Sequence, residues 1–320
     1  MTEPSCLFFE HALLPAGWAR DVRVGIAGDG LIAQVQCGVE AVGARHALGI
    51  PGLANAHSHA FQRAMAGLAE HSPAGAADSF WGWRETMYRF VERLEPRHVE
   101  AIATLAYTQM LESGFTRVAE FHYLHHDPRG RRYADAGEMC AALIAAAHAS
   151  GIGLTLGLCP ITEANLGDGV FPAVAYAAEG GRLAVGTDSN VHISAAQELA
   201  LLEYGQRLTL RRRNCLGGAS GSPGRGLLAL ALRGGAQACG IAGGRIETGA
   251  RADLVALDAA HPSLCAQQQD GWLDGWIFAA GDAAVSAVWV GGQQVVHGGR
   301  HPLAARARER YRDCLRGLQA

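Results

Sequence analysis

The stretch from Pro51 to Ala60, PGLANAHSHA, ends an apolar run on two histidines that are separated by one residue. Alternate side chains of a β-strand point to the same face, so His57 and His59 converge from the carboxyl end of one strand. Neutral imidazole is a common ligand of Zn²⁺ and of other first-row divalent metals. The motif therefore predicts a metal site, although a pair of loop histidines would show the same spacing.

A carboxylate that could complete this site follows a later apolar run. Asp188 ends an apolar strand within the segment AVGTDSN, and the carboxyl ends of strands are where barrel enzymes place their catalytic groups. An aspartate at that position can bind a metal and accept a proton from water, but it can also cap the helix expected near residue 194. We predict that His57, His59 and Asp188 are metal ligands and that Asp188 is also catalytic.

The middle of the chain alternates short apolar runs with longer helical patterns, which is typical of parallel βα units. Only about four such units can be counted, whereas a closed (β/α)8 barrel needs eight. The sequence therefore predicts an incomplete barrel over residues 51–245. The expected strands are 48–56, 116–122, 153–160 and 182–188, and the expected helices are 96–112, 134–150, 194–211 and 225–240.

Both ends of the chain are rich in β-forming residues. Residues 21–36 form two β-like runs around a Gly-Asp-Gly turn, and residues 285–300 repeat this pattern around a Gly-Gly turn after the run at 251–258. We expect one small β-sandwich domain built from residues 1–50 and 246–302, followed by a surface helix at 303–320.

Composition excludes several classes of protein. The 320-residue chain has a formal net charge of −3, and its one dense basic run, Arg211–Arg213, lacks interleaved aromatic residues, so no nucleic-acid partner is expected. The chain has no lysine, which excludes Schiff-base chemistry. Eight scattered cysteines fit reduced thiols in the cytoplasm. The uncharged segment 141–162 is interrupted at HASGIG, so we expect no membrane span.

Five segments carry a resemblance to a known family: PGLANAHSHAFQRAMAGLAE, SFWGWRETMYRF, VAEFHYLHHDP, CPITEANLGDG and GTDSNVHISAAQELALLEYGQRLTLRRRN. Together they resemble the formimidoylglutamate deiminases of histidine degradation, which belong to the metal-dependent amidohydrolases. The resemblance implies a (β/α)8 barrel with one Zn²⁺ that hydrolyses N-formimino-L-glutamate to N-formyl-L-glutamate and ammonia. Because lysine is absent, a carbamylated lysine cannot bridge two metals, and a mononuclear site is the remaining option.

The resemblance also implies which residues hold the small-molecule substrate, namely Gln62, Arg84 and Tyr123. Arg84 has a physical rationale, because a planar guanidinium can bind a carboxylate of glutamate through two hydrogen bonds. Without the family context, Arg84 could be a surface arginine on an aromatic-rich helix, and Tyr123 could be a packed core residue.

The sequence departs from the family pattern in its middle. The family's further histidines, one a metal ligand and one that moves protons, have no match, and GIGLTLGLCP looks like a third strand fused to the end of a seventh. The family usually has Ser-His-Val after the aspartate, where this chain has Ser189-Asn190-Val191. The histidines His122, His125, His126 and His192 are poor substitutes.

Three functional hypotheses remain open at this stage. The first is the deiminase itself. The second is a non-catalytic remnant that binds metal weakly, because two histidines and one aspartate form an incomplete shell. The third is another mononuclear deaminase acting on a guanidine, triazine or purine. The exposed strand edges of a partial sheet also allow a homodimer.

Overall fold

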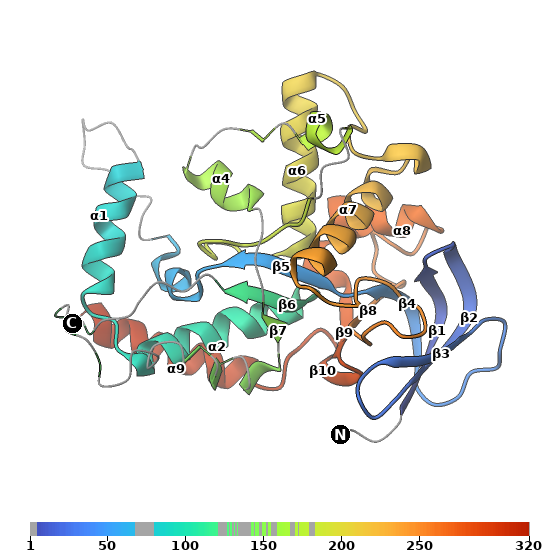
Figure 1. Cartoon of the computed structure of the whole chain (residues 1–320), viewed down its shortest axis with the longest axis horizontal. Coiled ribbons are helices and arrows are strands. Elements are labelled where there is room, and N and C mark those ends of the chain that lie inside the picture. The colour runs from blue at the N-terminus through green and yellow to red at the C-terminus, as the bar shows by residue number, and fades with distance from the viewer. Residues whose placement is uncertain are drawn as a thin grey trace.

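The computed structural model of the chain describes residues 5–67, 80–120, 127, 129, 131, 133, 142–143, 145–146, 149–151, 153–154, 159–166, 170–171, 173–178 and 183–319. Figure 1 shows the N-terminal strands beside the strands near the C-terminus, while the long helices gather around a second, smaller sheet. The two sheets divide the molecule into a β-rich part and a helix-covered part.

The β-rich part is one seven-stranded sheet with the order β10-β9-β8-β4-β1-β2-β3. It confirms that the two ends of the chain build a common β structure. The hairpin predicted at 21–36 and the one at 285–300 both form antiparallel pairs. The strands are β1 (Ser5–Leu14), β2 (Gly17–Ile26), β3 (Ile32–Gln36), β4 (Arg45–Pro51), β8 (Leu254–Leu257), β9 (Val285–Val290) and β10 (Gln293–His297).

The sheet curls so that its β3 end returns to the strands from the C-terminal part. Leu31 forms an isolated antiparallel bridge with Arg251, and a side chain at Gly30 would meet the carbonyl oxygen of Gly291 at 2.8 Å. Between the curled layers, Phe9 packs edge-on against Trp289 with ring centroids 5.9 Å apart. This separate apolar core is consistent with the expected β-sandwich, and the domain boundaries drawn above remain a prediction that it supports.

The second sheet is parallel and contains β5 (Leu53–Ser58), β6 (Phe115–Glu120) and β7 (Gly153–Leu154). A parallel bridge between Ser58 and Asp188 adds the segment predicted at 182–188, which among the described residues forms isolated bridges but no continuous strand. The described residues thus form one sector of a barrel, in agreement with the predicted incomplete (β/α)8 architecture.

The strand expected at 48–56 is divided between the two sheets. The β4 strand ends at Pro51 in the seven-stranded sheet, and β5 begins at Leu53 in the parallel sheet. Gly52 lies between them, and a side chain there would meet the Thr116 side chain at 2.2 Å. The sequence predicts one strand because the whole run is apolar, whereas the strand pairings show that the chain changes sheet at Gly52.

The long helices lie close to the predicted ranges, and the helix at 96–112 matches its prediction. The described residues within 134–150 that carry secondary structure are helical. Within the strand expected at 153–160, the described residues form β7 at Gly153–Leu154, and a helix begins at Pro160; residues 155–158 lie outside the described residues. The helices are α1 (Phe80–Val91), α2 (Pro96–Glu112), α4 (Pro160–Leu166), α5 (Ala173–Ala178), α6 (Ala195–Leu210), α7 (Pro223–Ala238), α8 (Asp270–Gly275) and α9 (Ala304–Gln319).

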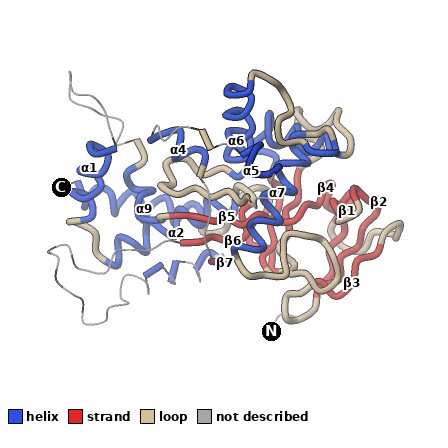
Figure 2. Tube along the Cα trace, turned by 45° about the horizontal axis from the view of Figure 1, so that its top comes forward, coloured by secondary structure: helices blue, strands red, loops and turns tan. Residues whose placement is uncertain are grey.

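Helix α9 packs along α2, and Figures 1 and 2 show both on the same side of the parallel sheet. Arg308 and Arg310 of α9 pair with Glu112 and Glu100 of α2 at 3.4 and 3.1 Å. Short helical turns, η1 (Ala60–Met65), η2 (Gly218–Ser220), η3 (Trp276–Ala280) and η4 (Gly281–Ala284), complete the described elements. Within the described ranges, each helix is too short or too polar to span a bilayer.

A buried carboxylate joins the two sheets. Asp253, just before β8, is 4% exposed and accepts hydrogen bonds from the backbone N–H of Gly291 at 2.7 Å and from Arg251 Nε at 3.1 Å. Its second oxygen lies 3.2 Å from Nε of Arg117 on β6. Because one carboxylate serves groups from both sheets, its loss should leave buried donors and a buried guanidinium without a counter-charge.

Replacing Asp253 with alanine should therefore destabilise the protein by ~3–5 kcal/mol, which is the typical effect of breaking a buried ion pair from one side. The free energy of unfolding in urea measures this effect. The control is Asp313→Ala, whose ion pair with Arg316 on α9 is exposed and should contribute under about 1 kcal/mol. Equal stability losses in the two variants would contradict the role given to Asp253.

Candidate metal centre

The structure brings the three predicted ligands together. Nε2 of His57 lies 3.2 Å from Nε2 of His59 and 3.5 Å from Oδ1 of Asp188, and the His59 and Asp188 atoms are 3.2 Å apart. Ligands at ~2.0–2.1 Å from a tetrahedral metal are about 3.3 Å from one another. Three nitrogen and oxygen donors at this spacing therefore fit one divalent cation without rearrangement.

The three side chains form a half-open site. His59 is 11% exposed, and the side chains of His57 and Asp188 are 27% and 26% exposed. Partial exposure suits a catalytic centre, since a metal with three protein ligands keeps a position open to water or substrate. The arrangement can hold a metal that stays partly accessible to solvent and place the Asp188 carboxylate against a bound water.

Backbone hydrogen bonds fix the position of Asp188 relative to β5. The carbonyl of His57 accepts the N–H groups of Thr187 and Asp188, both at 2.9 Å, and the N–H of His59 donates to the carbonyl of Asp188 at 2.7 Å. The two chains approach so closely that a side chain at Gly186 would meet the His57 backbone nitrogen at 2.5 Å. A glycine at 186 is therefore required for the ligands to come together.

Asp188 and Asn190 both have left-handed backbone conformations, with φ values of 40° and 55°. Aspartate and asparagine adopt this region more readily than other residues with side chains. These two left-handed residues turn the chain sharply after the strand-like segment. As a result, the Asp188 side chain faces the histidines. The alternative reading of Asp188 as a cap for helix α6 is wrong, because Ser194 accepts the N–H of Gln197 and fills that role.

A buried polar network underlies the ligands, and sequence reasoning missed it. The Asn55 amide accepts the N–H of Thr187 at 3.0 Å and donates to the Thr187 hydroxyl at 2.6 Å. The side chain of Asn190 donates to the Ser58 hydroxyl at 3.0 Å and to the Asp188 carbonyl at 3.1 Å. Asn55 lies two residues before His57, on the same face of an apolar strand. This polar side chain was the feature of the sequence that could have indicated the buried network.

Glu120 is a second residue that the sequence did not single out. It ends β6 beside Ser58 of β5, and its Oε1 accepts the N–H of Ala60 at 2.6 Å. Burial raises the pKa of the Glu120 carboxyl to about 8, although hydrogen bonds from Ala60 and Ser58 oppose this shift. The group is therefore mainly neutral near pH 7 and adds little negative charge to the metal centre.

The predicted substrate residues fall in different places. Gln62, in η1, is 3% exposed, and its amide nitrogen donates to the sulfur of Met87 at 3.6 Å. Arg84, on α1, donates to the Tyr88 hydroxyl at 3.0 Å and lies over the Tyr88 ring. Helix α1 contacts η1, which directly follows His59, so both residues lie beyond the end of β5. Tyr123 is outside the described residues, as are His122, His125 and His126.

Described residues of the segment expected to contain the seventh strand meet the centre at Cys159, whose thiol lies 3.8 Å from the His57 carbonyl oxygen, and at Thr162. Thr162, on α4, donates its hydroxyl to the Thr187 carbonyl at 3.2 Å and lies 2.9 Å from the Ser189 hydroxyl. Glu198 of α6 accepts the N–H of Ile161 at 3.0 Å, and burial raises the pKa of its carboxyl. His192 is exposed and does not belong to the ligand cluster found among the described residues.

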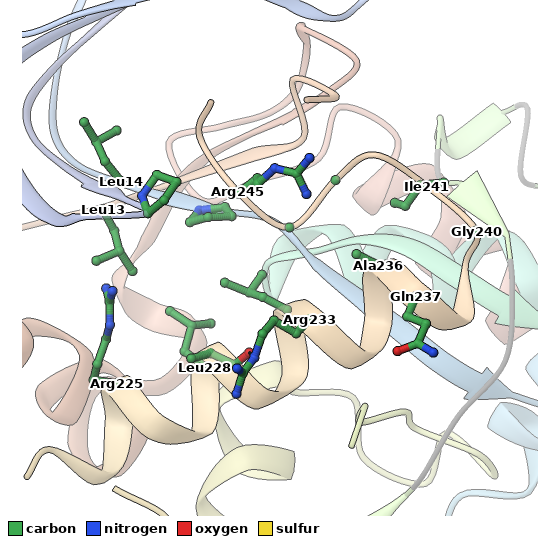
Figure 3. Close-up of a pocket in the computed structure, with 16 residues that line it drawn as sticks. Leu13, Leu14, Arg225, Leu228, Arg233, Ala236, Gln237, Gly240, Ile241 and Arg245 are labelled. Carbon is green, nitrogen blue, oxygen red and sulfur yellow. Dashed lines mark hydrogen bonds between the residues drawn. The ribbon is translucent and has the colours of Figure 1, made fainter. Parts of the chain in front are cut away.

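A cavity of about 600 Å³ lies elsewhere, between α7 and the end of β1. Figure 3 shows Leu13 and Leu228 facing it, with Arg225 extending from the start of α7 toward Leu13. None of the residues that line this cavity belongs to the ligand cluster. The cavity is therefore separate from the candidate metal centre.

Comparisons with known proteins identify the family. The model "Formimidoylglutamate deiminase HutF, N-terminal domain" matches residues 5–47, and the amidohydrolase family model matches residues 49–156 and 138–295. A formimidoylglutamate deiminase from Pseudomonas aeruginosa is 37% identical, and the alignment covers 93% of this chain and 96% of that protein. The chain belongs to the formimidoylglutamate deiminases. The family that the sequence segments resemble is thus confirmed.

Solved structures confirm the fold class of this deiminase family member. An amidohydrolase from Brucella melitensis has a TM-score of 0.91 and 34% sequence identity, with 98% of this chain and 100% of that chain covered. An adenosine deaminase from Xanthomonas campestris with bound zinc has a TM-score of 0.74 at 19% identity over 98% of both chains. The second likeness shows the fold alone.

The alignment with the Pseudomonas deiminase also locates the missing part of the barrel. It is 435 positions long, while 93% of this chain is about 298 residues, so about 137 positions of the alignment have no counterpart here. The two amidohydrolase matches overlap at residues 138–156, close to the junction predicted within 151–160. These findings support the interpretation that strands from the middle of the barrel are absent from this chain.

Replacing Gly186 with alanine should separate the two ligand-bearing segments. The added methyl group would press on the His57 backbone, so we expect a loss of ~1–3 kcal/mol in the free energy of unfolding and weaker Zn²⁺ binding. Gly317→Ala is the control, because open space surrounds that helical position and alanine should be neutral or stabilising there. Unchanged Zn²⁺ affinity in Gly186→Ala would disprove the requirement for glycine.

Glu120 should make stability fall as pH rises. Its pKa is raised from 4.5 to about 8 in the folded state. Its contribution to the free energy of unfolding is therefore complete below about pH 4.5 and is lost as pH rises through about 8. Glu120→Gln cannot titrate, and the difference in unfolding free energy between pH 5 and pH 8.5 should shrink by roughly 2–4 kcal/mol. The exposed Glu10→Gln variant is the control and should keep the pH dependence of the parent. If the unfolding free energy of Glu120→Gln changed with pH as steeply as that of the parent, the raised pKa of Glu120 would be contradicted.

Proposed function

We propose that this chain carries the hydrolytic deimination of its family, in which N-formimino-L-glutamate and water give N-formyl-L-glutamate and ammonia during histidine degradation. The observation that carries the proposal is the spacing of the His57, His59 and Asp188 donor atoms, each pair 3.2–3.5 Å apart at the ends of neighbouring segments. The family relationship supports the choice of substrate.

His57, His59 and Asp188 would hold one Zn²⁺, or another divalent first-row metal, per chain. When bound, such a cation supplies the Lewis acidity that makes water a nucleophile at neutral pH. The nitrogen and oxygen donor set fits zinc, and the zinc-bound adenosine deaminase shares the fold. The half-exposed Asp188 carboxylate leaves room for water and substrate on the open side of the ligands.

Asp188 is the residue placed to move the proton. Its carboxylate accepts a proton as water adds to the amidine carbon, and the protonated carboxyl then carries the proton that departing ammonia requires. No other carboxylate belongs to the cluster that the described residues form at this site. Asp188 therefore serves both as a ligand and as the general acid and base.

Gln62, Arg84 and Tyr123 would bind the glutamate part of the substrate. Arg84 provides a planar guanidinium for a carboxylate, and Gln62 lies in η1, the turn that follows His59. We place the protein in the cytoplasm, acting on a small-molecule substrate without nucleic acid or a membrane as partner. The exposed edges of its incomplete parallel sheet allow a homodimer.

A second candidate function is metal binding without turnover. The family relationship supports the deiminase, and this second candidate rests on the length of the alignment, because about 137 alignment positions lack a counterpart in this chain. The two candidates differ in one measurement, the release of ammonia from N-formimino-L-glutamate by folded, zinc-loaded protein. A rate equal to the blank, with one metal retained per chain, would favour the second candidate.

Asp188→Asn should lower ammonia release by ~10²–10⁴-fold, because the variant loses the general base, and it should also reduce the metal content. Metal analysis after dialysis and a coupled ammonia assay measure the two effects. The exposed Asp313→Asn variant controls for the change of charge and should match the parent. Activity that persists in Asp188→Asn would overturn the assigned role.

A further inference from the structure

The residue between the two histidine ligands faces away from the metal and into a buried hydrogen-bond network. Ser58 is 0% exposed, and strand alternation turns its side chain opposite to those of His57 and His59. Its hydroxyl accepts from the Asn190 amide at 3.0 Å and hydrogen-bonds to the Glu120 carboxyl. Ser58 thus connects β6 on one side with the Asp188 turn on the other.

On the β6 side, Glu120 controls where the chain turns after His59. His59 precedes η1, and its side chain makes no capping hydrogen bond. The Glu120 carboxyl takes that place by accepting the N–H of Ala60 at 2.6 Å. A carboxylate oxygen from a neighbouring strand therefore fixes the backbone immediately after the second ligand.

On the other side, Asn190 controls the turn that carries Asp188. Its amide nitrogen contacts both the Ser58 hydroxyl and the Asp188 carbonyl, and its oxygen accepts from the Thr187 hydroxyl at 2.5 Å. Asn190 is fully buried, and its left-handed conformation is one that asparagine tolerates.

We propose that Glu120 and Asn190 are positioning residues, which act through Ser58 to hold His59 and Asp188 at metal-binding distance. The physical reason is that each of the two ligands lies where its segment ends and the chain turns, and backbone pairing there is limited to the hydrogen bonds between residues 57–59 and 187–188. Buried side-chain hydrogen bonds to these turns add to that pairing, and their loss leaves buried polar groups unsatisfied and lets the turns relax. This proposal rests on the metal centre proposed above.

The test is the affinity of the full-length protein for Zn²⁺, measured by competition with a chromophoric chelator in the absence of substrate. Ser58→Ala and Glu120→Ala should each weaken Zn²⁺ binding by ~10–100-fold, the usual effect of removing groups that orient metal ligands. Glu120→Gln keeps an oxygen that can accept the Ala60 N–H and should restore affinity to within about threefold of the parent. Because no substrate is present, the result is independent of whether the chain releases ammonia.

The matched control is Glu203→Gln, which changes a fully buried carboxyl that bonds Arg207 and the N–H groups of Cys215 and Leu216, away from the ligands. Glu203→Gln should lose stability and keep its Zn²⁺ affinity. The positioning variants should lose Zn²⁺ affinity at a comparable loss of stability. The absorption spectrum of the Co²⁺-substituted protein adds a direct readout, since a relaxed ligand geometry changes the intensity of its visible bands.

Asn190→Ala combined with Ser58→Ala tests the connection between the two turns. If the residues act through one network, the double variant should weaken binding by less than the product of the two single effects. Ser58→Ala removes one oxygen atom only and remains informative if Glu120→Ala fails to fold. Parental Zn²⁺ affinity and an unchanged Co²⁺ spectrum in Ser58→Ala, or equal losses in Glu120→Gln and Glu120→Ala, would overturn the proposal.

Discussion

The close contact between β5 and the segment that ends at Asp188 is the constraint on which the candidate centre depends. Ligands from residues 57, 59 and 188 can share one cation only if their backbones lie side by side. The His57 carbonyl meets this requirement by accepting two N–H groups, and Gly186 provides the space. A first and a last barrel strand adjoin in a closed (β/α)8 barrel, so this contact survives even though the described parallel sheet is incomplete.

The remaining structure supports this contact from two directions. The seven-stranded sheet is tied to the parallel sheet by Asp253, whose carboxylate serves Arg117 on β6 as well as Gly291 and Arg251. Helices α2 and α9 cover one side of the parallel strands, and α7 contacts β5. The ligand-bearing strand is therefore held by a β domain, by helices and by a neighbouring strand, although much of the family's barrel has no counterpart in the chain.

The alignment with the Pseudomonas aeruginosa deiminase bears differently on the family of this chain and on its activity. The deiminase family is evident from segments spread along the chain, because the ligand motif and the split β domain lie outside the missing part. The resemblance implies that the family's middle strands contribute a further ligand and a proton-transferring histidine, and neither has a match in this chain. The cluster that the described residues form contains two histidines and one carboxylate, that of Asp188.

The sequence by itself indicated the candidate ligand residues, the long helices and the common β structure at the two ends, because strand alternation, helical periodicity and turn residues are local properties. It also indicated the junction in the middle, since the number of βα units is too small for a closed barrel. Only the tertiary structure decided that the run at 48–56 changes sheets at Gly52, that Asp188 faces the histidines from a left-handed turn, and that Glu120 and Asn190 meet Ser58. These contacts join residues more than sixty positions apart, and no local pattern records which buried polar groups will become neighbours when the chain packs.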